Sequence, residues 1–237
     1  MTRAVIPARE RLIFAMDVPT PDAARRLADR LGDSVSFYKL GLELFMSGEA
    51  FPLLDALAGG GKKIFLDLKL FDVPATVAGA VRNLKDRGVT FATVHGNQAI
   101  MEAAAGAAQG FGILAVTVLT SLDRGDLDDL GFDCDVEALV LSRARRALAA
   151  GCAGVVSSGL EAKMLRAGVD DRLIVVTPGI RPVENRPADD QKRVVSVQDA
   201  FANGADYIVV GRPIRDAADP RAAAESIQAT IAGLFPG

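Results

Sequence analysis

The sequence predicts an α/β fold, an eight-fold (β/α)8 barrel in which a closed ring of parallel strands is covered by outer helices. Short apolar runs rich in β-branched and aromatic residues alternate with longer, alanine-rich amphipathic runs. This alternation indicates parallel strands joined by helical crossovers. Eight such units in 237 residues fit one closed TIM barrel, so we expect residues 1–237 to form a single domain. An open doubly wound sheet stays an alternative, because periodicity does not show closure.

The elements follow from this alternation. Strands are expected at residues 12–18, 35–40, 63–69, 90–95, 112–119, 154–157, 173–177 and 206–210. Helices are expected at residues 21–31, 42–58, 75–87, 99–109, 136–150, 160–167, 197–203 and 220–234. Pro21 behind Thr20, a candidate N-cap, and Pro74 before the third helix are typical of helix starts. In such a barrel the functional groups lie where strands end and βα loops begin.

Composition excludes several classes of function. A net charge of −3 gives no general field for nucleic acid or an anionic membrane, so an anionic ligand must be held by local groups. Cys134 and Cys152 do not make a disulfide framework, and a single histidine cannot complete a conventional zinc set, so no metal is expected. The thiols favour a reducing cytoplasm. The N-terminus has no apolar signal region, and no apolar run is long enough to span a membrane.

Charged residues mark the end of the third predicted strand. Side chains alternate along a strand, so Phe65, Asp67 and Lys69 share one face, while leucines on the other face suit packing against helices. The Asp67 and Lys69 face is therefore expected to look into the barrel mouth. Asp72 follows just past the strand, where a loop can aim it back. Opposite charges on an enclosed face are costly unless they are paired.

The first two strands repeat this pattern. Ile13, Ala15 and Asp17 share one face, and Phe37 and Lys39 share another that is apolar below and cationic above. We predict an alternating row of Lys39, Asp67, Lys69 and Asp72, with Asp17 beside it. A structural ion-pair cluster is the competing interpretation, since buried pairs also fix register. Charges that end three strands at the catalytic face favour a catalytic centre.

A phosphate site is expected after strands seven and eight, where such barrels commonly bind phosphate. Strand seven leads to Arg181, and a long charged loop continues to about Arg193, as functional lids often do. Strand eight ends at Gly211 and Arg212. The glycine lets a backbone N–H approach a ligand closely, and the arginine can hold phosphate with its planar fork.

These motifs resemble a known family. Residues 66–76, Leu-Asp-Leu-Lys-Leu-Phe-Asp-Val-Pro-Ala-Thr, resemble the Asp-x-Lys-x-x-Asp signature of orotidine 5'-phosphate decarboxylases. Residues 14–18, 38–41, 116–121, 177–181, 190–193 and 210–213 resemble further stretches of that family in the same order. The resemblance implies a homodimer with shared active sites that converts orotidine 5'-phosphate to uridine 5'-phosphate (UMP) and CO2. This is the last step of de novo pyrimidine synthesis, and it needs neither metal nor organic cofactor.

The resemblance also implies roles for individual residues. Lys69 would donate the proton to C6 of the pyrimidine, and Asp67 would lie near the departing carboxylate. Lys39 and Asp17 would contact the ribose region and complete the charge network. The other implied substrate contacts are Asp72 and Thr76 in the neighbouring subunit's site, Thr120 at the pyrimidine, and Arg181, Gln191, Gly211 and Arg212 at the phosphate.

Two other functions compete with this one. 3-Keto-L-gulonate 6-phosphate decarboxylase and hexulose 6-phosphate synthase carry the same signature, but they resemble metal-assisted enzymes with a glutamate near the end of strand two. Lys39 stands there in this sequence, a cation where a Mg²⁺ ligand would be needed. The second alternative is a catalytically silent nucleotide-binding barrel, against which the presence of Lys69, Asp67 and Asp72 argues.

Overall fold

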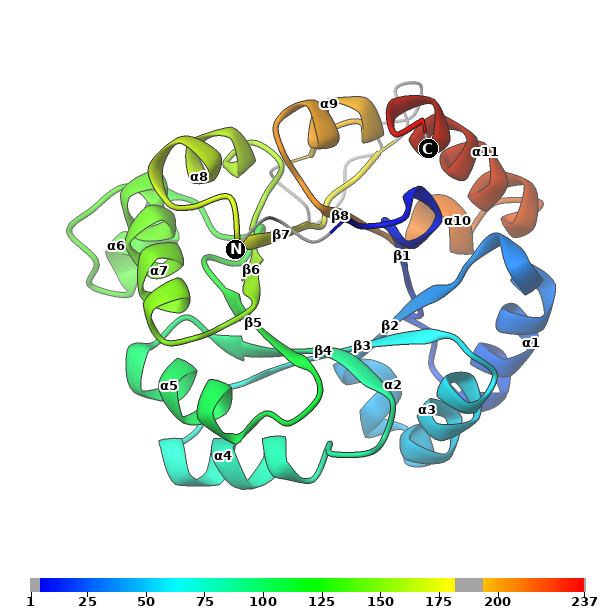
Figure 1. Cartoon of the computed structure of the whole chain (residues 1–237), viewed down its shortest axis with the longest axis horizontal. Coiled ribbons are helices and arrows are strands. Elements are labelled where there is room, and N and C mark those ends of the chain that lie inside the picture. Colours follow the sequence, from blue (N-terminus) through cyan, green and yellow to red (C-terminus); the bar gives the residue numbers. More distant parts are fainter. Residues whose placement is uncertain (1–4, 182–193, 237) are drawn as a thin grey trace.

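The computed structural model describes residues 5–181 and 194–236, and these form a closed barrel of eight strands (Figure 1). The strands are β1 Leu12–Ala15, β2 Phe37–Gly41, β3 Lys63–Leu70, β4 Val89–His95, β5 Gly112–Val116, β6 Gly154–Val156, β7 Ile174–Thr177 and β8 Tyr207–Val210. Each strand pairs in parallel with the next one in sequence, and β8 pairs with β1. The prediction of a closed barrel is therefore confirmed, and the open sheet is wrong.

The helices surround this barrel on its outside (Figure 1). They are α1 Pro21–Leu31, α2 Leu42–Met46, α3 Ala50–Gly59, α4 Pro74–Arg82, α5 Gln98–Ala107, α6 Arg124–Asp129, α7 Val136–Ala149, α8 Ala162–Gly168, α9 Val197–Ala202, α10 Arg212–Arg215 and α11 Pro220–Leu234, with 3-10 turns η1 Ala8–Glu10 and η2 Gly32–Ser34. Thr20 caps α1 as expected, because its hydroxyl accepts a hydrogen bond from Ala23 N at 3.2 Å.

Three parts of the helical layer differ from the prediction. The helix expected at residues 42–58 is two helices, α2 and α3, with Gly48 at φ 111° between them. Helix α6 was not expected, and it begins with a capping box in which Asp123 and Asp126 bond each other's backbone N–H groups. Helix α10 begins at Arg212, directly after β8.

Two apolar layers fix the position of the site. The larger one packs the outward side chains of the strands against the helices. The smaller one fills the barrel interior with inward side chains, among them Phe37, Phe65, Phe91 and Tyr207. Phe91 lies 5.8 Å from the Phe37 ring and 5.6 Å from the Tyr207 ring, between centroids. This packed aromatic layer closes the interior, so polar chemistry is confined to the ends of the strands.

In the described residues, no helix has the length and apolarity that a membrane crossing requires.

Candidate active site

A cavity of about 600 Å³ lies at the carboxyl ends of the strands. Most of the residues predicted from the sequence line it: Asp17, Lys39, Asp67, Lys69, Thr120, Arg181, Gly211 and Arg212. They come from several strands and loops far apart in the sequence, and the closed barrel brings them to one mouth. Ser121, the neighbour of Thr120, also lines the cavity.

Four of these residues form a row of alternating charge. Lys39 Nζ lies 2.9 Å from Asp17 Oδ1 and 3.5 Å from Asp67 Oδ2. Lys69 Nζ lies 2.9 Å from the same Asp67 oxygen. Of the predicted row, Lys39, Asp67 and Lys69 are together in the structure, and Asp17 lies beside Lys39 as expected. Its centre is the most enclosed part, since Lys39 and Asp67 are buried while Asp17 and Lys69 are partly exposed.

The two buried members of the row stay charged. Burial alone would lower the pKa of Lys39, but the carboxylates of Asp67 and Asp17 outweigh it and hold that pKa above its ordinary value. Burial alone would raise the pKa of Asp67, but Lys39 and Lys69 outweigh it and hold that pKa below its ordinary value. The buried Lys39 ammonium and Asp67 carboxylate therefore face the cavity as a fixed ion pair, with Lys69 Nζ 2.9 Å from the same carboxylate.

A bulge at the end of β3 positions Lys69. Leu66 pairs with Ala92 of β4 and Leu70 pairs with Val94, so three residues of β3 lie opposite one residue of β4. Within the bulge Lys69 has φ 49°, the left-handed region that costs an L-residue about 1–2 kcal/mol. Lysine occupies this conformation rarely, and the surrounding bonds must stabilise it.

Thr93 supplies those bonds. Lys69 N donates to Thr93 Oγ1 at 2.9 Å, and Thr93 Oγ1 donates to Asp67 Oδ1 at 2.9 Å. One hydroxyl thus fixes both the backbone of the lysine and the second oxygen of the aspartate. Thr93 was not among the predicted site residues, although the period of two along β4 places it on the inward face with Phe91.

Gly41 is a second residue that the sequence analysis missed. A Cβ at this position would lie 3.0 Å from Asp17 Oδ1 and 3.1 Å from Lys39 Nζ. The absence of a side chain therefore makes room for the Asp17–Lys39 pair. The resemblance covered this glycine within residues 38–41, but no pattern in the sequence gave it a role.

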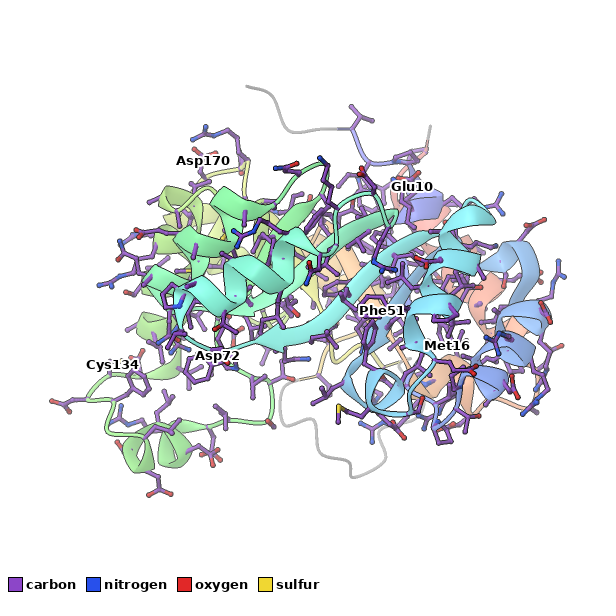
Figure 2. All side chains as sticks on the ribbon, turned by 90° about the horizontal axis from the view of Figure 1, so that it is seen from below. Glu10, Met16, Phe51, Asp72, Cys134 and Asp170 are labelled. Carbon is purple, nitrogen blue, oxygen red and sulfur yellow. The ribbon has the colours of Figure 1, made fainter. Side chains whose placement is uncertain are left out.

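Asp72 does not join the row within one chain, which corrects the expectation that its loop aims it back. It lies just beyond the end of the β3 ribbon (Figure 2), and it is exposed and does not line the cavity. Its Oδ1 accepts a hydrogen bond from Val73 N at 2.6 Å. Thr76, in the first turn of α4, is exposed as well. The assignment of both residues to a neighbouring subunit's site stays a prediction.

The expected phosphate end opens onto the same cavity. Arg181 is buried, and its Nη1 donates to Ile180 O at 2.9 Å. Gly211 lies close to β1, since a Cβ there would be 3.3 Å from the Cβ of Ala15. Arg212 follows it at the start of α10. Gln191 lies outside the described residues, so its predicted contact stays untested.

The described part of the chain holds no group of three His, Cys, Asp or Glu side chains that could bind a metal ion.

Comparison with known proteins gives one consistent result. A family model described as "Orotidine 5'-phosphate decarboxylase / HUMPS family" matches residues 10–227. The orotidine 5'-phosphate decarboxylase of Methylococcus capsulatus is 68% identical over 230 residues, which are 97% of this chain and 95% of that protein. Its counterpart in Xanthomonas oryzae pv. oryzae is 54% identical over 235 residues, 98% of this chain and 96% of that protein. The crystal structure of orotidine 5'-phosphate decarboxylase from Lactobacillus acidophilus, 33% identical, matches with a TM-score of 0.83 over 94% of this chain and 99% of that one.

Fold and site together define an enzyme of the (β/α)8-barrel class with fixed charges at the carboxyl ends of its strands. The matches extend over nearly the whole chain and include the charged motif of β3. The chain belongs to the orotidine 5'-phosphate decarboxylase / HUMPS family, and it is an enzyme of the carboxy-lyase class.

Proposed function

We propose that this chain decarboxylates orotidine 5'-phosphate to UMP and CO2 in pyrimidine biosynthesis, with a C6 carbanion protonated by Lys69 and without a cofactor. One observation supports this mechanism most directly: the buried carboxylate of Asp67 lies between the ammonium groups of Lys39 and Lys69, at 3.5 and 2.9 Å. The full-length similarity to proteins of that name supports the substrate and the pathway.

The charge row meets the electrostatic demand of this reaction. Loss of CO2 leaves an electron pair on C6, a ring carbon with little delocalisation, so fixed positive charge must stabilise it. The Lys69 ammonium supplies that charge and then transfers a proton to C6, which completes UMP. Asp67 holds Lys69 in place and puts negative charge beside the substrate carboxylate, which favours its departure as neutral CO2.

Lys39 separates this proposal from metal-assisted chemistry. Its ammonium lies between Asp17 and Asp67, the two carboxylates that could otherwise approach a divalent cation together. A Mg²⁺ ion at that point would face a second cation held by the same carboxylates. We therefore assign Lys39 and Asp17 to the ribose region and to the charge network.

Substrate binding is proposed to use the rest of the cavity wall. Thr120 faces the pyrimidine, and the phosphate is held by Arg181, Gln191, Gly211 and Arg212. Binding energy from this distant phosphate can order the site and press the ring against the charge row, which raises turnover as well as affinity. Asp72 and Thr76 contribute to the site of the second subunit in a homodimer.

The test is a spectrophotometric assay with purified protein that has been stripped of metal. Orotidine 5'-phosphate absorbance is expected to disappear with formation of UMP, and a chelator is expected to leave the rate unchanged. Lys69→Ala is expected to abolish turnover while nucleotide binding stays measurable. Activity that a chelator removes and Mg²⁺ restores would contradict the cofactor-free mechanism. Turnover of Lys69→Ala near the wild-type rate would contradict the role of Lys69.

A further inference from the structure

Asp17 lies beyond the part of β1 that the sheet holds. The last pairings of β1 are Ala15 with Lys39 on one side and Phe14 with Val210 on the other. Met16 N still donates to Lys39 O at 2.9 Å, but the strand ends there. The carboxylate that pairs with Lys39 Nζ therefore stands on a loop, and its position needs a further anchor.

Arg215 supplies that anchor from α10, which follows β8, the strand that pairs with β1 to close the barrel. Its Nη1 donates to the backbone carbonyl of Asp17 at 2.7 Å. The other two nitrogens bond Asp216, with Nε 2.6 Å from Oδ1 and Nη2 3.0 Å from Oδ2. All three guanidinium nitrogens are thus engaged, and the bidentate pair orients the fork so that one N–H points at Asp17.

The base of Arg215 is also fixed. It belongs to α10, the short helix between β8 and α11, and Arg215 N donates to Gly211 O at 2.9 Å. Its neighbour Ile214 is fully buried. Because Arg212 begins the same helix, one rigid turn carries both a residue proposed to hold the phosphate and the residue that holds Asp17.

We infer that Arg215 is a positioning residue that acts through Asp17, and that Asp216 orients Arg215 for this role. The inference rests on the proposed function, in which Asp17 and Lys39 serve the reacting nucleotide. Contacts then run without a break from Asp216 through Arg215 and Asp17 to Lys39. Arg215 also lines the cavity, so direct contact with the phosphate is the competing role.

A double-mutant cycle separates the two roles. Arg215→Gln removes the fork and is expected to lower kcat/KM for orotidine 5'-phosphate about tenfold, which corresponds to about 1.4 kcal/mol. In an Asp17→Asn background the same change is expected to cost less than about twofold, because residues that act through one another are not additive. Arg215→Lys keeps the charge but not the bidentate geometry, and it is expected to recover part of the loss.

Arg172→Gln is the matched control. Arg172 makes a bidentate pair with Asp170 in the same manner, with Nε 3.0 Å from Oδ1 and Nη2 2.9 Å from Oδ2, but it lies at the turn before β7, outside the cavity wall. The kcat/KM of Arg172→Gln is expected to equal that of wild type. A tenfold loss of kcat/KM from Arg215→Gln in both backgrounds would overturn the inference in favour of a phosphate contact. Weaker binding of UMP with unchanged binding of uridine would overturn it in the same way.

A crystal structure of Arg215→Gln tests the inference independently of substrate. The separation of Asp17 Oδ1 from Lys39 Nζ, 2.9 Å here, is expected to exceed the salt-bridge range of about 4 Å. An unchanged pair would overturn the positioning role whatever the enzyme decarboxylates. Failure of wild type to turn over orotidine 5'-phosphate would instead contradict the proposed function.

Discussion

Thr93→Val is the sharpest perturbation of the charge row, because valine has the shape of threonine without the hydroxyl. The change removes two hydrogen bonds of 2.9 Å, one from Lys69 N and one to Asp67 Oδ1. It leaves a carboxylate oxygen without its hydroxyl donor. It also removes the contact that holds Lys69 at φ 49°.

The expected loss of kcat/KM in Thr93→Val follows from the type of hydrogen bond that is removed. A hydrogen bond to a charged group contributes about 1.5–3 kcal/mol, and a neutral one about 0.5–1.5 kcal/mol. If about 2 kcal/mol of this is lost from the transition state, kcat/KM falls about thirtyfold. The free energy of unfolding is expected to fall by about 1 kcal/mol, since the bulge can relax when its strained residue is released.

The assay combines steady-state kinetics with urea unfolding. Thr93→Ser keeps the hydroxyl and is expected to retain most of the activity. Thr90→Val, on the same strand at its other end, controls for the loss of a strand hydroxyl and is expected to leave kcat/KM unchanged. A Thr93→Val enzyme within twofold of wild type would refute the argument that this hydroxyl positions Lys69 and Asp67.

Gly41, the pair Lys69 and Asp72, and His95 each give a further prediction. Gly41→Ala puts a Cβ 3.1 Å from Lys39 Nζ. We expect kcat/KM to fall about tenfold, which corresponds to about 1.4 kcal/mol, with little change in Tm. An unchanged kcat/KM would contradict the argument that Gly41 makes room for the Asp17–Lys39 pair. Inactive Lys69→Ala and Asp72→Ala proteins are expected to regain some activity when mixed, because a mixed dimer can hold one intact site; no recovery after proven subunit exchange would count against a shared site. Half-burial of His95 at the end of β4, and then the charges of Arg143 and Lys69, lower the pKa of its imidazole. The signal of this sole histidine in NMR is therefore expected to titrate below 6.5, and a midpoint at or above 6.5 would contradict this environment.

The lowered pKa of His95 also makes the stability of the fold depend on pH. A lowered pKa in the folded state means that the unfolded chain binds the proton more readily. The contribution of His95 to stability is therefore complete above about pH 6.5 and is lost as the pH falls below that value through the folded pKa. His95→Gln is expected to remove this part of the pH dependence, as measured by urea unfolding at pH 7 and pH 5. If wild type and His95→Gln lose the same free energy of unfolding between pH 7 and pH 5, the pH dependence comes from other groups.

The sequence predicted the barrel and the charged residues at its mouth because both depend on short-range periodicity. Apolar alternation marks the strands, and parallel strands bring their carboxyl ends to one edge, so residues such as Asp17, Lys39 and Asp67 are found together without knowledge of distances. The contact of Arg215 with Asp17 is different. It joins residues 198 positions apart, where β8 meets β1, and no local pattern encodes such a pair.

Strand alternation correctly placed Asp67 and Lys69 toward the cavity, although β3 is irregular between them and Leu70. The prediction assumed regular β structure through Lys69, but a bulge interrupts it there. Between Leu66 and Leu70 the strand advances four positions while its partner β4 advances two, from Ala92 to Val94. The difference is an even number, so the outward face before the bulge is outward again after it. One extra residue instead of two would have turned Leu70 toward the cavity, and the alternation would have assigned the wrong face to the residues beyond the bulge.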